Sequence, residues 1–408
     1  MSNPFKTSKI QKEFLGCSKT KTYNNPFDIL YKDKKTSARV GKLSTRKGVI
    51  ETPFFMPVAT KATAKFVNPA NLYETGARAI ISNALILSIR PGAKHIRKMG
   101  GIGKFMNFPG INVTDSGGFQ MYSPNIYINS NNEGVWFRNP ISGEKLFITP
   151  EKDMEIQLDI GSDIAMCLDR MPLYENSKKE IANAVELTTK WAERCKKHHD
   201  KLQKNLPLNK RQLLFGIVQG GIYKDLREKS ASELLKLDLD GYSIGGLALP
   251  DDCYKGDKEK AKKLEYSAIE VYKKIIPENK ITYLMGEGEP VEVLEAVSRG
   301  IDMFDSKYPT ETARRGTLLT TSGKIKILNK KYLLDKNSID KNCKCFVCSN
   351  YSRAYIRHLL KEDEGVGKEL ASYHNLFFMQ KLFNDIRVAI RDGKFLEFKK
   401  KMRKTFMK

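Results

Sequence analysis

The feature that most constrains the fold is a series of eight short, β-prone runs between residues 53 and 304. Their apolar residues are nearly continuous, which is typical of parallel strands that are buried on both faces. Stretches with helical spacing separate the runs. Eight strands alternating with helices predict a (β/α)8 barrel, and a doubly wound parallel sheet is the competing layout. The runs are 53–58, 79–82, 111–114, 163–168, 213–218, 241–244, 281–285 and 303–304.

Helix signals support this alternation. The stretch 177–204 opens with Ser177 as a candidate N-cap and repeats apolar residues at helical spacing. Similar patterns cover 223–237 and 290–299, and Gly300 stands where a helix commonly ends.

Composition narrows the class of protein. Of 408 residues, 40% are hydrophobic and 29% are charged, which excludes a fully disordered or fibrous chain. The net charge of +24 favours a polyanionic partner, most simply nucleic acid, although a lysine-rich proteome would also explain it. No apolar stretch approaches the ~20 residues of a membrane span, and the N-terminus lacks a secretory apolar core. These features predict a cytoplasmic protein without a membrane partner.

The same patterns divide the chain into four expected parts. Ser, Asn, Lys and Thr dominate the first 26 residues, which read as a flexible extension. The parts are an extension at 1–26, a barrel at 27–315, a zinc-binding subdomain with helices at 316–390, and a basic C-terminal helix at 391–408.

Polar residues and glycines follow most of the predicted strands. Active sites of (β/α)8 barrels lie at the carboxyl ends of the strands, so these residues indicate a site there. For any one position, a simple turn is the alternative explanation. The residues are Asp115 to Gly118, Asp169, Gln219 to Gly221, Gly245, Gly246, Gly286 to Gly288 and Asp305.

A cysteine cluster predicts a metal site. The sequence Cys-Lys-Cys-Phe-Val-Cys supplies Cys343, Cys345 and Cys348, and His374 follows in a helix-like stretch. Three thiolates and one imidazole fill a tetrahedral Zn²⁺ shell and leave no open position, so the site is expected to be structural. His358 is the rival fourth ligand. Seven cysteines, an odd number, fit a reduced metal-binding protein better than a disulfide scaffold.

Three carboxylates suggest chemistry at an anomeric carbon. Asp115, Asp169 and Asp305 each fall at a predicted strand end. One carboxylate can attack C1′ while a second transfers the proton, and a third can accept two N–H bonds from a guanine edge. A helix cap or a salt bridge is the alternative role for each.

Several motifs in a fixed order resemble the tRNA-guanine transglycosylase family of bacterial type. The resemblance runs from about Phe27 to Phe395 and includes the cysteine and histidine spacing. The motifs are Thr-Pro-Phe-Phe-Met-Pro-Val at 52–58, Arg-Pro-Gly at 90–92, Thr-Asp-Ser-Gly-Gly-Phe-Gln at 114–120, Gly-Ile-Val-Gln-Gly-Gly at 216–221, Gly-Gly-Leu-Ala at 245–248, Tyr-Leu-Met-Gly at 283–286 and Gly-Ile-Asp-Met-Phe-Asp at 300–305.

The resemblance implies exchange of guanine at the wobble position of tRNA for a 7-deazaguanine, preQ1 or queuine. The reaction is a double displacement through a covalent enzyme–RNA intermediate, in which Asp305 matches the nucleophile and Asp115 the general acid/base. The positions that match base-binding residues are Ser116, Gly117, Gly118, Phe119, Asp169, Gln219, Gly246 and Met285. The positions that match contacts to the anticodon loop are Gly286, Glu287, Gly288, Glu289, Pro290, Val291, Glu292, Thr310, Glu311, Thr312, Ala313 and Arg314.

It also implies one structural Zn²⁺ per chain, held by Cys343, Cys345, Cys348 and His374, and a homodimer. Tyr351, Tyr355 and His358 match positions at the family's dimer interface. Basic residues at 399–404 are candidate phosphate contacts, and a solvated helix end is the alternative.

Two departures from the family pattern stand out. Glu311 occupies a place where members commonly carry a basic residue, and Ala84, Leu85 and Ile86 replace the usual Thr-Tyr-His after Asn83. A non-catalytic RNA-binding partner subunit and a relative that exchanges bases in DNA are therefore kept as alternatives. The presence of both Asp115 and Asp305 counts against the partner subunit.

Overall fold

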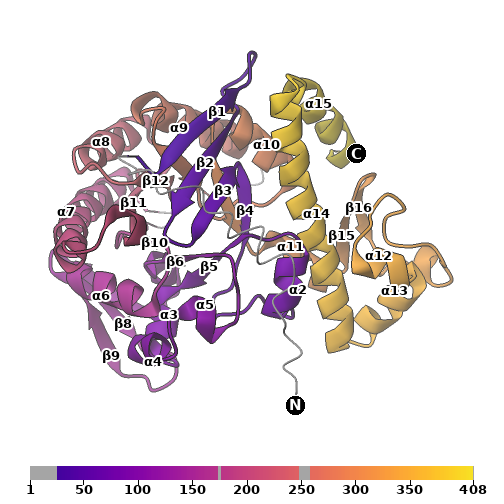
Figure 1. Ribbon diagram of the computed structural model, residues 1–408, viewed down its shortest axis with the longest axis horizontal. Helices are drawn as coiled ribbons and strands as arrows, with labels where there is room; N and C mark the ends of the chain where they lie inside the picture. Colours follow the sequence, from indigo (N-terminus) through magenta and orange to yellow (C-terminus); the bar gives the residue numbers. More distant parts are fainter. Residues whose placement is uncertain (1–24, 173–175, 248–257, 408) are drawn as a thin grey trace.

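A closed barrel of eight parallel strands forms the centre of the molecule (Figure 1). The computed structural model describes residues 25–172, 176–247 and 258–407. The strands pair in the order β4-β14-β13-β12-β11-β10-β6-β5, and a parallel bridge between Val58 and Ile81 joins the first strand to the last. The predicted barrel is therefore confirmed. Its strands are β4 (Phe54–Pro57), β5 (Ala79–Asn83), β6 (Ile111–Asp115), β10 (Ile164–Met166), β11 (Leu213–Val218), β12 (Gly241–Ile244), β13 (Ile281–Leu284) and β14 (Met303–Ser306).

Helices surround the barrel, as Figure 1 shows. The expected Ser177 cap is present in a capping box with Glu180, and Gly300 follows the end of α10 with a φ of 89°. The elements along this part of the chain are α2 (Pro69–Glu74), α3 (Ala84–Ile89), α4 (Ala93–Lys98), α5 (Ile102–Phe105), α6 (Pro150–Ile160), α7 (Lys178–Gln203), η2 (Leu208–Lys210), α8 (Lys224–Leu235), α9 (Lys258–Ile275) and α10 (Pro290–Ser298).

A small antiparallel sheet closes the N-terminal end of the barrel. It consists of β1 (Phe27–Lys32), β2 (Arg39–Thr45) and β3 (Gly48–Thr52), which leads directly into β4. Phe27 and Leu43 pack in the same buried cluster as the inward-facing side chains of the barrel strands. Because this end is filled, an open site is left to the carboxyl ends of the strands.

Two further units extend from the barrel. After β6 come η1 (Gly118–Tyr122) and an antiparallel sheet of β7 (Tyr127–Asn131), β8 (Gly134–Arg138) and β9 (Lys145–Ile148). After β14 comes a subdomain with its own buried core. It contains α11 (Tyr308–Arg314), the hairpin of β15 (Thr317–Thr320) and β16 (Gly323–Lys326), η3 (Lys330–Tyr332), α12 (Phe346–Asn350) and α13 (Arg353–Lys361).

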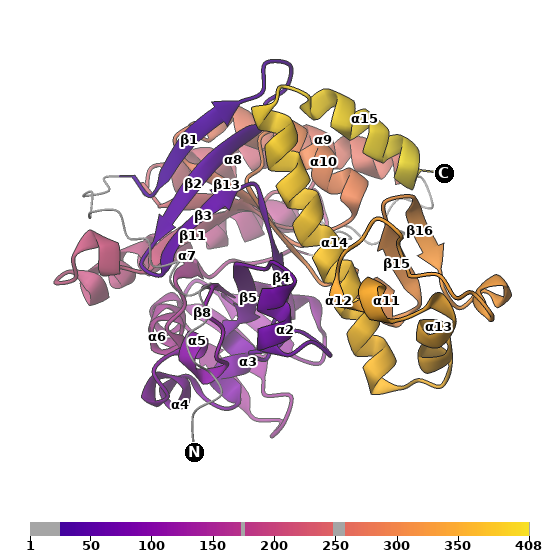
Figure 2. The same cartoon turned by 45° about the vertical axis from the view of Figure 1, so that its right-hand side comes forward.

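The long helix α14 (Gly365–Arg391) joins this subdomain to the barrel, as Figure 2 shows. Its first half packs in the subdomain core, and farther along it Phe383 contacts the rings of Phe55 and Phe304 on the outside of the barrel. Helix α15 (Phe395–Phe406) then packs beside α10 and α14. Residues 1–24 of the expected N-terminal extension lie outside the described residues.

Among the helices of the described residues, none is both long enough and apolar enough to cross a membrane.

Candidate active site and metal centre

The three candidate carboxylates meet at the carboxyl ends of the barrel strands. Asp115 ends β6, Asp305 lies in β14, and Asp169 follows β10 by three residues. The charges of Asp305 and Asp169 both raise the pKa of Asp115, so the three groups share one electrostatic environment. The structure thus brings together side chains that are up to 190 positions apart in sequence.

Asp115 is held by two donors that bind the same carboxylate oxygen. Asn83 Nδ2 lies 2.7 Å from Oδ1, and the backbone N of Gly117 lies 2.9 Å from it. Burial raises the pKa of Asp115 to about 7, against the opposing effect of these hydrogen bonds. A carboxyl group that titrates near neutrality can both donate and accept a proton, which is what a general acid/base requires.

Asn83 explains part of the departure at residues 84–86. Its Nδ2 also donates to Gln120 Oε1 at 2.6 Å, while its Oδ1 caps α3 by accepting from the backbone N of Ile86. Ala84 and Leu85 are buried in the barrel core. The asparagine therefore positions Asp115, and Ala84 and Leu85 serve packing. Sequence reasoning did not assign Asn83 this role, because an N-cap and a ligand to a carboxylate look alike in sequence.

Asp305 is held in a similar way. Tyr283 OH donates to Oδ1 at 2.5 Å, and the backbone N of Gly286 donates to the same oxygen at 2.9 Å. Burial raises the pKa of Asp305, and both hydrogen bonds oppose that rise. With both donors on Oδ1, Oδ2 is the oxygen left to act as a nucleophile. Sequence reasoning missed Tyr283, because it stands within an apolar strand.

Asp169 belongs to a second polar group beside these two acids. Gln219 Nε2 donates to Asp169 Oδ2 at 2.6 Å, and Ser116 Oγ donates to Oδ1 at 3.3 Å. Burial raises the pKa of Asp169 to about 6, which leaves it mainly ionised at neutral pH. Gln219 Oε1 is buried and has no hydrogen-bond partner among the described residues. A buried acceptor without a partner is costly, so this oxygen indicates a place where a ligand supplies a donor.

Glycines make room for this polar group. A Cβ at Gly118 would lie 2.1 Å from Asp169 Oδ1, and one at Gly246 would lie 2.9 Å from Gln219 Oε1. Gly246 also has a φ of 65°, which side chains other than glycine rarely adopt. Ser116 and Gly117 are buried beside them, and Met285 packs at the edge of the barrel core. The side chain of Phe119 lies outside the described residues.

A buried arginine ties together the loops that carry Gln219 and Gly246. Arg227 of α8 donates to the carbonyl oxygens of Val218, Gly221 and Gly245 at 2.6, 2.8 and 2.8 Å. Its guanidinium is fully buried, and burial lowers its pKa to about 9. Sequence reasoning missed this residue, since arginine within a charged helix reads as a surface position.

The predicted RNA segments carry acids that have partners within the chain. Glu289 pairs with Lys324 at 2.7 Å, and Glu292 accepts from Tyr266 OH at 2.6 Å. Burial raises the pKa of Glu287 to about 7, although nearby Lys262 opposes the rise. Segments 286–292 and 310–314 both begin close after barrel strands, at the same end as the carboxylates.

Glu311 is bridged by basic residues one turn away on either side. Its carboxylate lies 2.7 Å from Arg315 Nη2 and 3.3 Å from Lys307 Nζ. The basic side chains are 76% and 70% exposed, whereas Glu311 is 24% exposed. The outward charge of α11 is therefore positive despite the glutamate, and the repulsion of phosphate expected from Glu311 is offset.

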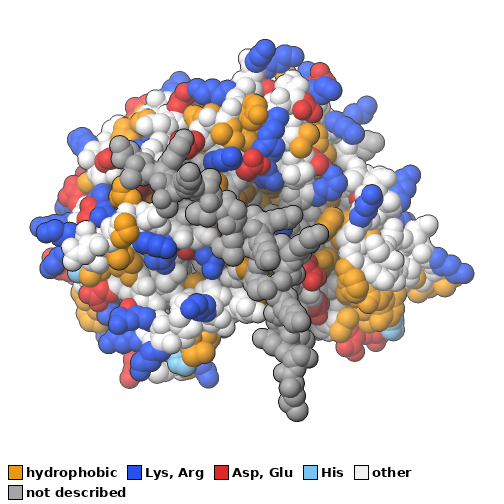
Figure 3. Space-filling view, in the orientation of Figure 1, with side chains coloured by type: hydrophobic (Ala, Val, Ile, Leu, Met, Phe, Trp, Pro, Cys, Tyr) orange, Lys and Arg blue, Asp and Glu red, His pale blue; other side chains and the backbone are white. Residues whose placement is uncertain are grey.

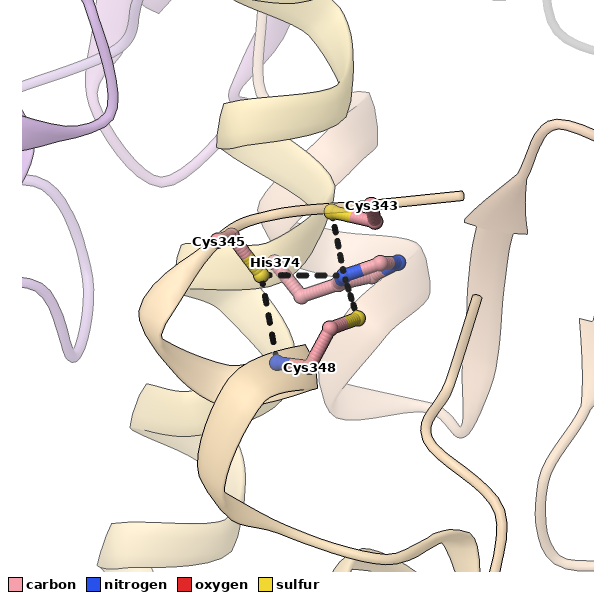
Figure 4. A group of neighbouring side chains, drawn as sticks. All are labelled: Cys343, Cys345, Cys348 and His374. Atoms are coloured by element: carbon pink, nitrogen blue, oxygen red, sulfur yellow. Dashed lines mark hydrogen bonds between the residues drawn. The ribbon is translucent and has the colours of Figure 1, made fainter. Parts of the chain in front are cut away.

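The cysteines and His374 form one compact cluster (Figure 4). Their ligand atoms all lie within 4.8 Å of one another, and His374 Nδ1 lies 3.9, 3.5 and 3.3 Å from the sulfurs of Cys343, Cys345 and Cys348. Tetrahedral zinc bonds imply sulfur–nitrogen separations of about 3.6 Å. These four residues could therefore hold a metal ion, and the donor set suits Zn²⁺.

The histidine is oriented for this role. His374 Nε2 lies 2.8 Å from the carbonyl oxygen of Leu319, so Nε2 carries the proton and Nδ1 faces the sulfurs. Hydrogen bonds among the three thiols lower the pKa of Cys345 and raise the pKa of Cys348, so Cys345 is the first of them to become a thiolate. The rival ligand His358 is exposed on α13 and is not part of the cluster.

Comparison with known proteins points to one family. The family model for queuine tRNA-ribosyltransferase matches residues 33–408. A protein of that name from Desulforamulus reducens is 46% identical over 375 residues, covering 92% of this chain and 97% of the relative. A protein of the same name from Lysinibacillus sphaericus is 44% identical over 373 residues, which cover 91% of this chain and 94% of the relative. Another, from Staphylococcus haemolyticus, is 45% identical over 366 residues, which cover 90% of this chain and 92% of the relative.

Proposed function

Because the chain belongs to the queuine tRNA-ribosyltransferase family, we propose that it exchanges guanine at the anticodon wobble position of tRNA for a 7-deazaguanine. The enzyme is a transferase, and the incoming base is preQ1 or queuine. The observation that carries the proposal is a pair of acids, Asp115 and Asp305, at the carboxyl ends of the barrel strands, which we call the barrel mouth. Each acid is held through one oxygen by its own donors.

The two acids divide the chemistry between them. Asp305 Oδ2 attacks C1′ of the wobble nucleoside, the bond from C1′ to N9 breaks, and Asp115 gives its proton to the departing guanine. The ribose is then esterified to Asp305, and the RNA chain is uncut. The incoming base gives its N9 proton to Asp115 and attacks C1′, which releases Asp305. Asp115 ends the cycle protonated, as it began.

Asp169 and Gln219 recognise the base. Ionised Asp169 accepts the N1–H and the exocyclic N–H of guanine, a paired contact that only acceptor oxygens can make. The second hydrogen of Gln219 Nε2 donates to O6, and Gly246 lets the backbone approach the ring. Ser116, Gly117, Gly118 and Phe119 line one side of the base, and Met285 closes the other.

The RNA contacts lie around this pocket. Segments 286–292 and 310–314 contact the anticodon loop, with Arg314 among the groups that bind phosphate. One guanidinium nitrogen of Arg314 is buried and has no hydrogen-bond partner among the described residues, which suits it to an anionic oxygen. Since the proposed substrate is tRNA, the cytoplasm is the proposed location.

We propose that the cysteine cluster holds one structural Zn²⁺. Four protein ligands complete a tetrahedral shell, so zinc when bound supplies a cross-link between the loop at 343–348 and α14. The cluster has no direct part in the exchange. Its effect on the reaction is to fix the subdomain that follows α11.

We propose that the enzyme is a homodimer. Figure 3 shows hydrophobic side chains gathered over the subdomain helices α12 and α13. Phe346 and Tyr355 are 54% and 43% exposed, and Tyr351 stacks on Tyr355 at 5.5 Å. Exposed aromatic clusters of this kind favour a protein partner, and a second copy is the occupant that the family resemblance implies.

The decisive test is base exchange by the purified chain alone. We expect labelled guanine to enter unmodified tRNA, and Asp305→Asn to abolish both this incorporation and the covalent RNA adduct. Competition with preQ1 and with queuine then identifies the incoming base. No incorporation by the wild-type chain alone would favour a partner subunit, and incorporation into duplex DNA but not tRNA would favour a DNA-modifying relative.

A further inference from the structure

We propose that helix α15 binds the sugar-phosphate backbone of the tRNA outside the anticodon loop, so that the whole tRNA binds more tightly than its isolated anticodon arm. The inference rests on the proposed function and extends it to a second surface. Three observations carry it: the unpaired positive charge of one face of α15, the firm packing of its other face, and its continuity with the barrel mouth.

The outer face of α15 carries positive charge that the protein itself does not neutralise. Lys400, Lys401, Arg403 and Lys404 are all exposed, and none forms an ion pair within the described part of the chain. Glu397 is the acid on this helix. Some other exposed lysines of this chain do pair with acids, as Lys229 does with Glu186. Unpaired basic side chains on one helix face are the electrostatic pattern of a phosphate contact.

The inner face of α15 is anchored, so these charges hold a fixed position. Phe395 and Phe406 are buried, and the ring of Phe406 lies 5.8 Å from that of Phe378 on α14. Lys399 donates to Glu295 at 2.7 Å and to Ser298 Oγ at 2.9 Å on α10. A helix fixed at both ends presents its charges without the entropic cost of ordering a loose tail.

The face is continuous with the barrel mouth. The turn between β15 and β16 packs so closely on the last turn of α15 that a Cβ at Gly323 would lie 2.8 Å from the carbonyl oxygen of Thr405. Strand β15 begins two residues after Arg315, which extends the positive end of α11. Lys326 on β16 is also exposed and unpaired within the described residues. Exposed basic residues thus lie at the ends of α11, on the hairpin and on α15, and Figure 2 shows the hairpin between the two helices.

The position of α15 explains why it is expected to bind the body of the tRNA and not the anticodon loop. In the proposed reaction the anticodon loop binds at the barrel mouth, where its wobble nucleoside contacts Asp115 and Asp305. Helix α15 lies beyond the β15–β16 hairpin from that mouth, so the phosphates that reach it belong to more distant parts of the same molecule. Lysine and arginine contacts of this kind position RNA without reading its sequence.

The test compares two RNAs and two sets of charge reversals. The α15 variant carries Lys400→Glu, Lys401→Glu, Arg403→Glu and Lys404→Glu. The matched control carries Lys197→Glu, Lys201→Glu, Lys204→Glu and Lys210→Glu, which change the net charge equally on the α7–η2 segment, on the other side of the barrel. Dissociation constants and guanine exchange are measured with a full-length tRNA and with its isolated anticodon stem-loop, over a range of salt concentrations.

We expect the α15 variant to bind full-length tRNA about tenfold or more weakly, with a salt slope smaller by about 2–4, and to bind the stem-loop as the wild type does. The control should lose little with either RNA. A variant with glutamine at the four α15 positions should fall between, which separates loss of attraction from added repulsion. Thermal melting verifies that each variant is folded.

Three results would overturn the inference: equal binding of both RNAs by the wild type, equal losses in the α15 and control variants, or an α15 loss that is as large for the stem-loop as for the tRNA. Failure of the proposed function has a different signature, since the wild-type chain would then exchange guanine in neither RNA.

Discussion

The barrel mouth and the cysteine cluster both bury ionisable groups, but the two sites differ in how completely those groups are satisfied by the protein. At the mouth, burial raises the pKa values of Asp115 and Asp169 to about 7 and about 6, and only some oxygens have protein partners. In the cluster, four donors surround one point and can satisfy one cation completely. The mouth is thus left incomplete until a substrate enters, whereas the cluster can be completed by an ion that stays.

The two sites also differ in how the chain assembles them. The mouth draws its residues from different strands of the barrel, so it exists only when the barrel is closed. The cluster draws on one loop and one helix, Cys343 to Cys348 and His374, within a core of its own. Substitutions at the mouth are therefore expected to reduce the reaction rate with little loss of stability. Substitutions in the cluster should instead reduce stability, with little direct effect on the chemistry.

The largest expected effect is on chemistry at the mouth. Asp115→Asn keeps the shape of the side chain and its acceptor oxygen but cannot transfer a proton. We expect formation of the covalent RNA adduct to slow by about 10²–10⁴-fold, as measured by single-turnover kinetics. Asp200→Asn, an exposed position on α7, is the control and should react at the wild-type rate.

The same variant tests whether the acid at position 115 lowers the stability of the folded protein. Because the pKa of folded Asp115 is raised from 3.8 to about 7, the folded state binds this proton more tightly than the unfolded state, and stability falls as pH rises between these values. Asp115→Asn removes that cost, so its melting temperature at pH 8 should equal or exceed that of the wild type. A clear loss of stability would break the comparison.

The second prediction concerns the cluster. Cys348→Ser removes one ligand from a four-ligand site, so we expect zinc content to fall from about one ion per chain to near zero and the free energy of unfolding to fall by more than about 3 kcal/mol. His358→Ala is the matched control, since this exposed imidazole stands outside the cluster, and it should keep both metal and stability. Retained zinc in Cys348→Ser would contradict the ligand assignment.

The sequence predicts one side of this comparison better than the other. The parallel strands 213–218 and 241–244 match β11 and β12 in their bounds, because buried parallel strands carry continuous apolar runs. The antiparallel strands β1 to β3, β7 to β9 and β15 to β16 went unpredicted. Several of them expose about half of their side chains or more, so polar residues interrupt the apolar ones and no continuous run forms.

The site shows the same division. Chemistry-bearing residues at strand ends, such as Asp115 and Asp305, are visible because glycine and aspartate interrupt the apolar pattern. Positioning residues are not visible: Tyr283 lies within a strand, and Arg227 within a charged helix. Their roles depend on which carbonyl or carboxylate the fold brings within 3 Å, and periodicity does not contain that information.

The third prediction measures how much the hydroxyl of Tyr283 contributes. Tyr283→Phe removes one of the two donors to Asp305 Oδ1, so the leaving carboxylate is less stabilised and its pKa rises further. We expect attack of the incoming base on the covalent adduct, the step in which Asp305 leaves, to slow by about tenfold, which corresponds to about 1.4 kcal/mol. Tyr242→Phe is matched, because it removes a buried hydroxyl on β12 that accepts from the backbone of Leu239 without touching Asp305. Equal losses in the two variants would indicate a packing effect alone.

The smallest expected effect is a shift in pH dependence at Asp115. Adduct formation needs this group protonated, so the rate should decline as pH rises through about 7. Asn83 Nδ2 stabilises the ionised form, and Asn83→Ser removes that donor while leaving an oxygen to cap α3. The pKa of Asp115 should therefore rise, and the alkaline limb of the rate profile should move to higher pH. Asn68→Ser, which alters the equivalent cap of α2 far from Asp115 in the chain, should leave the limb in place. A limb that moves to lower pH, or moves equally in both variants, would mean that the Asn83 amide does not set the proton affinity of the acid, and the mouth would then owe its chemistry to burial alone.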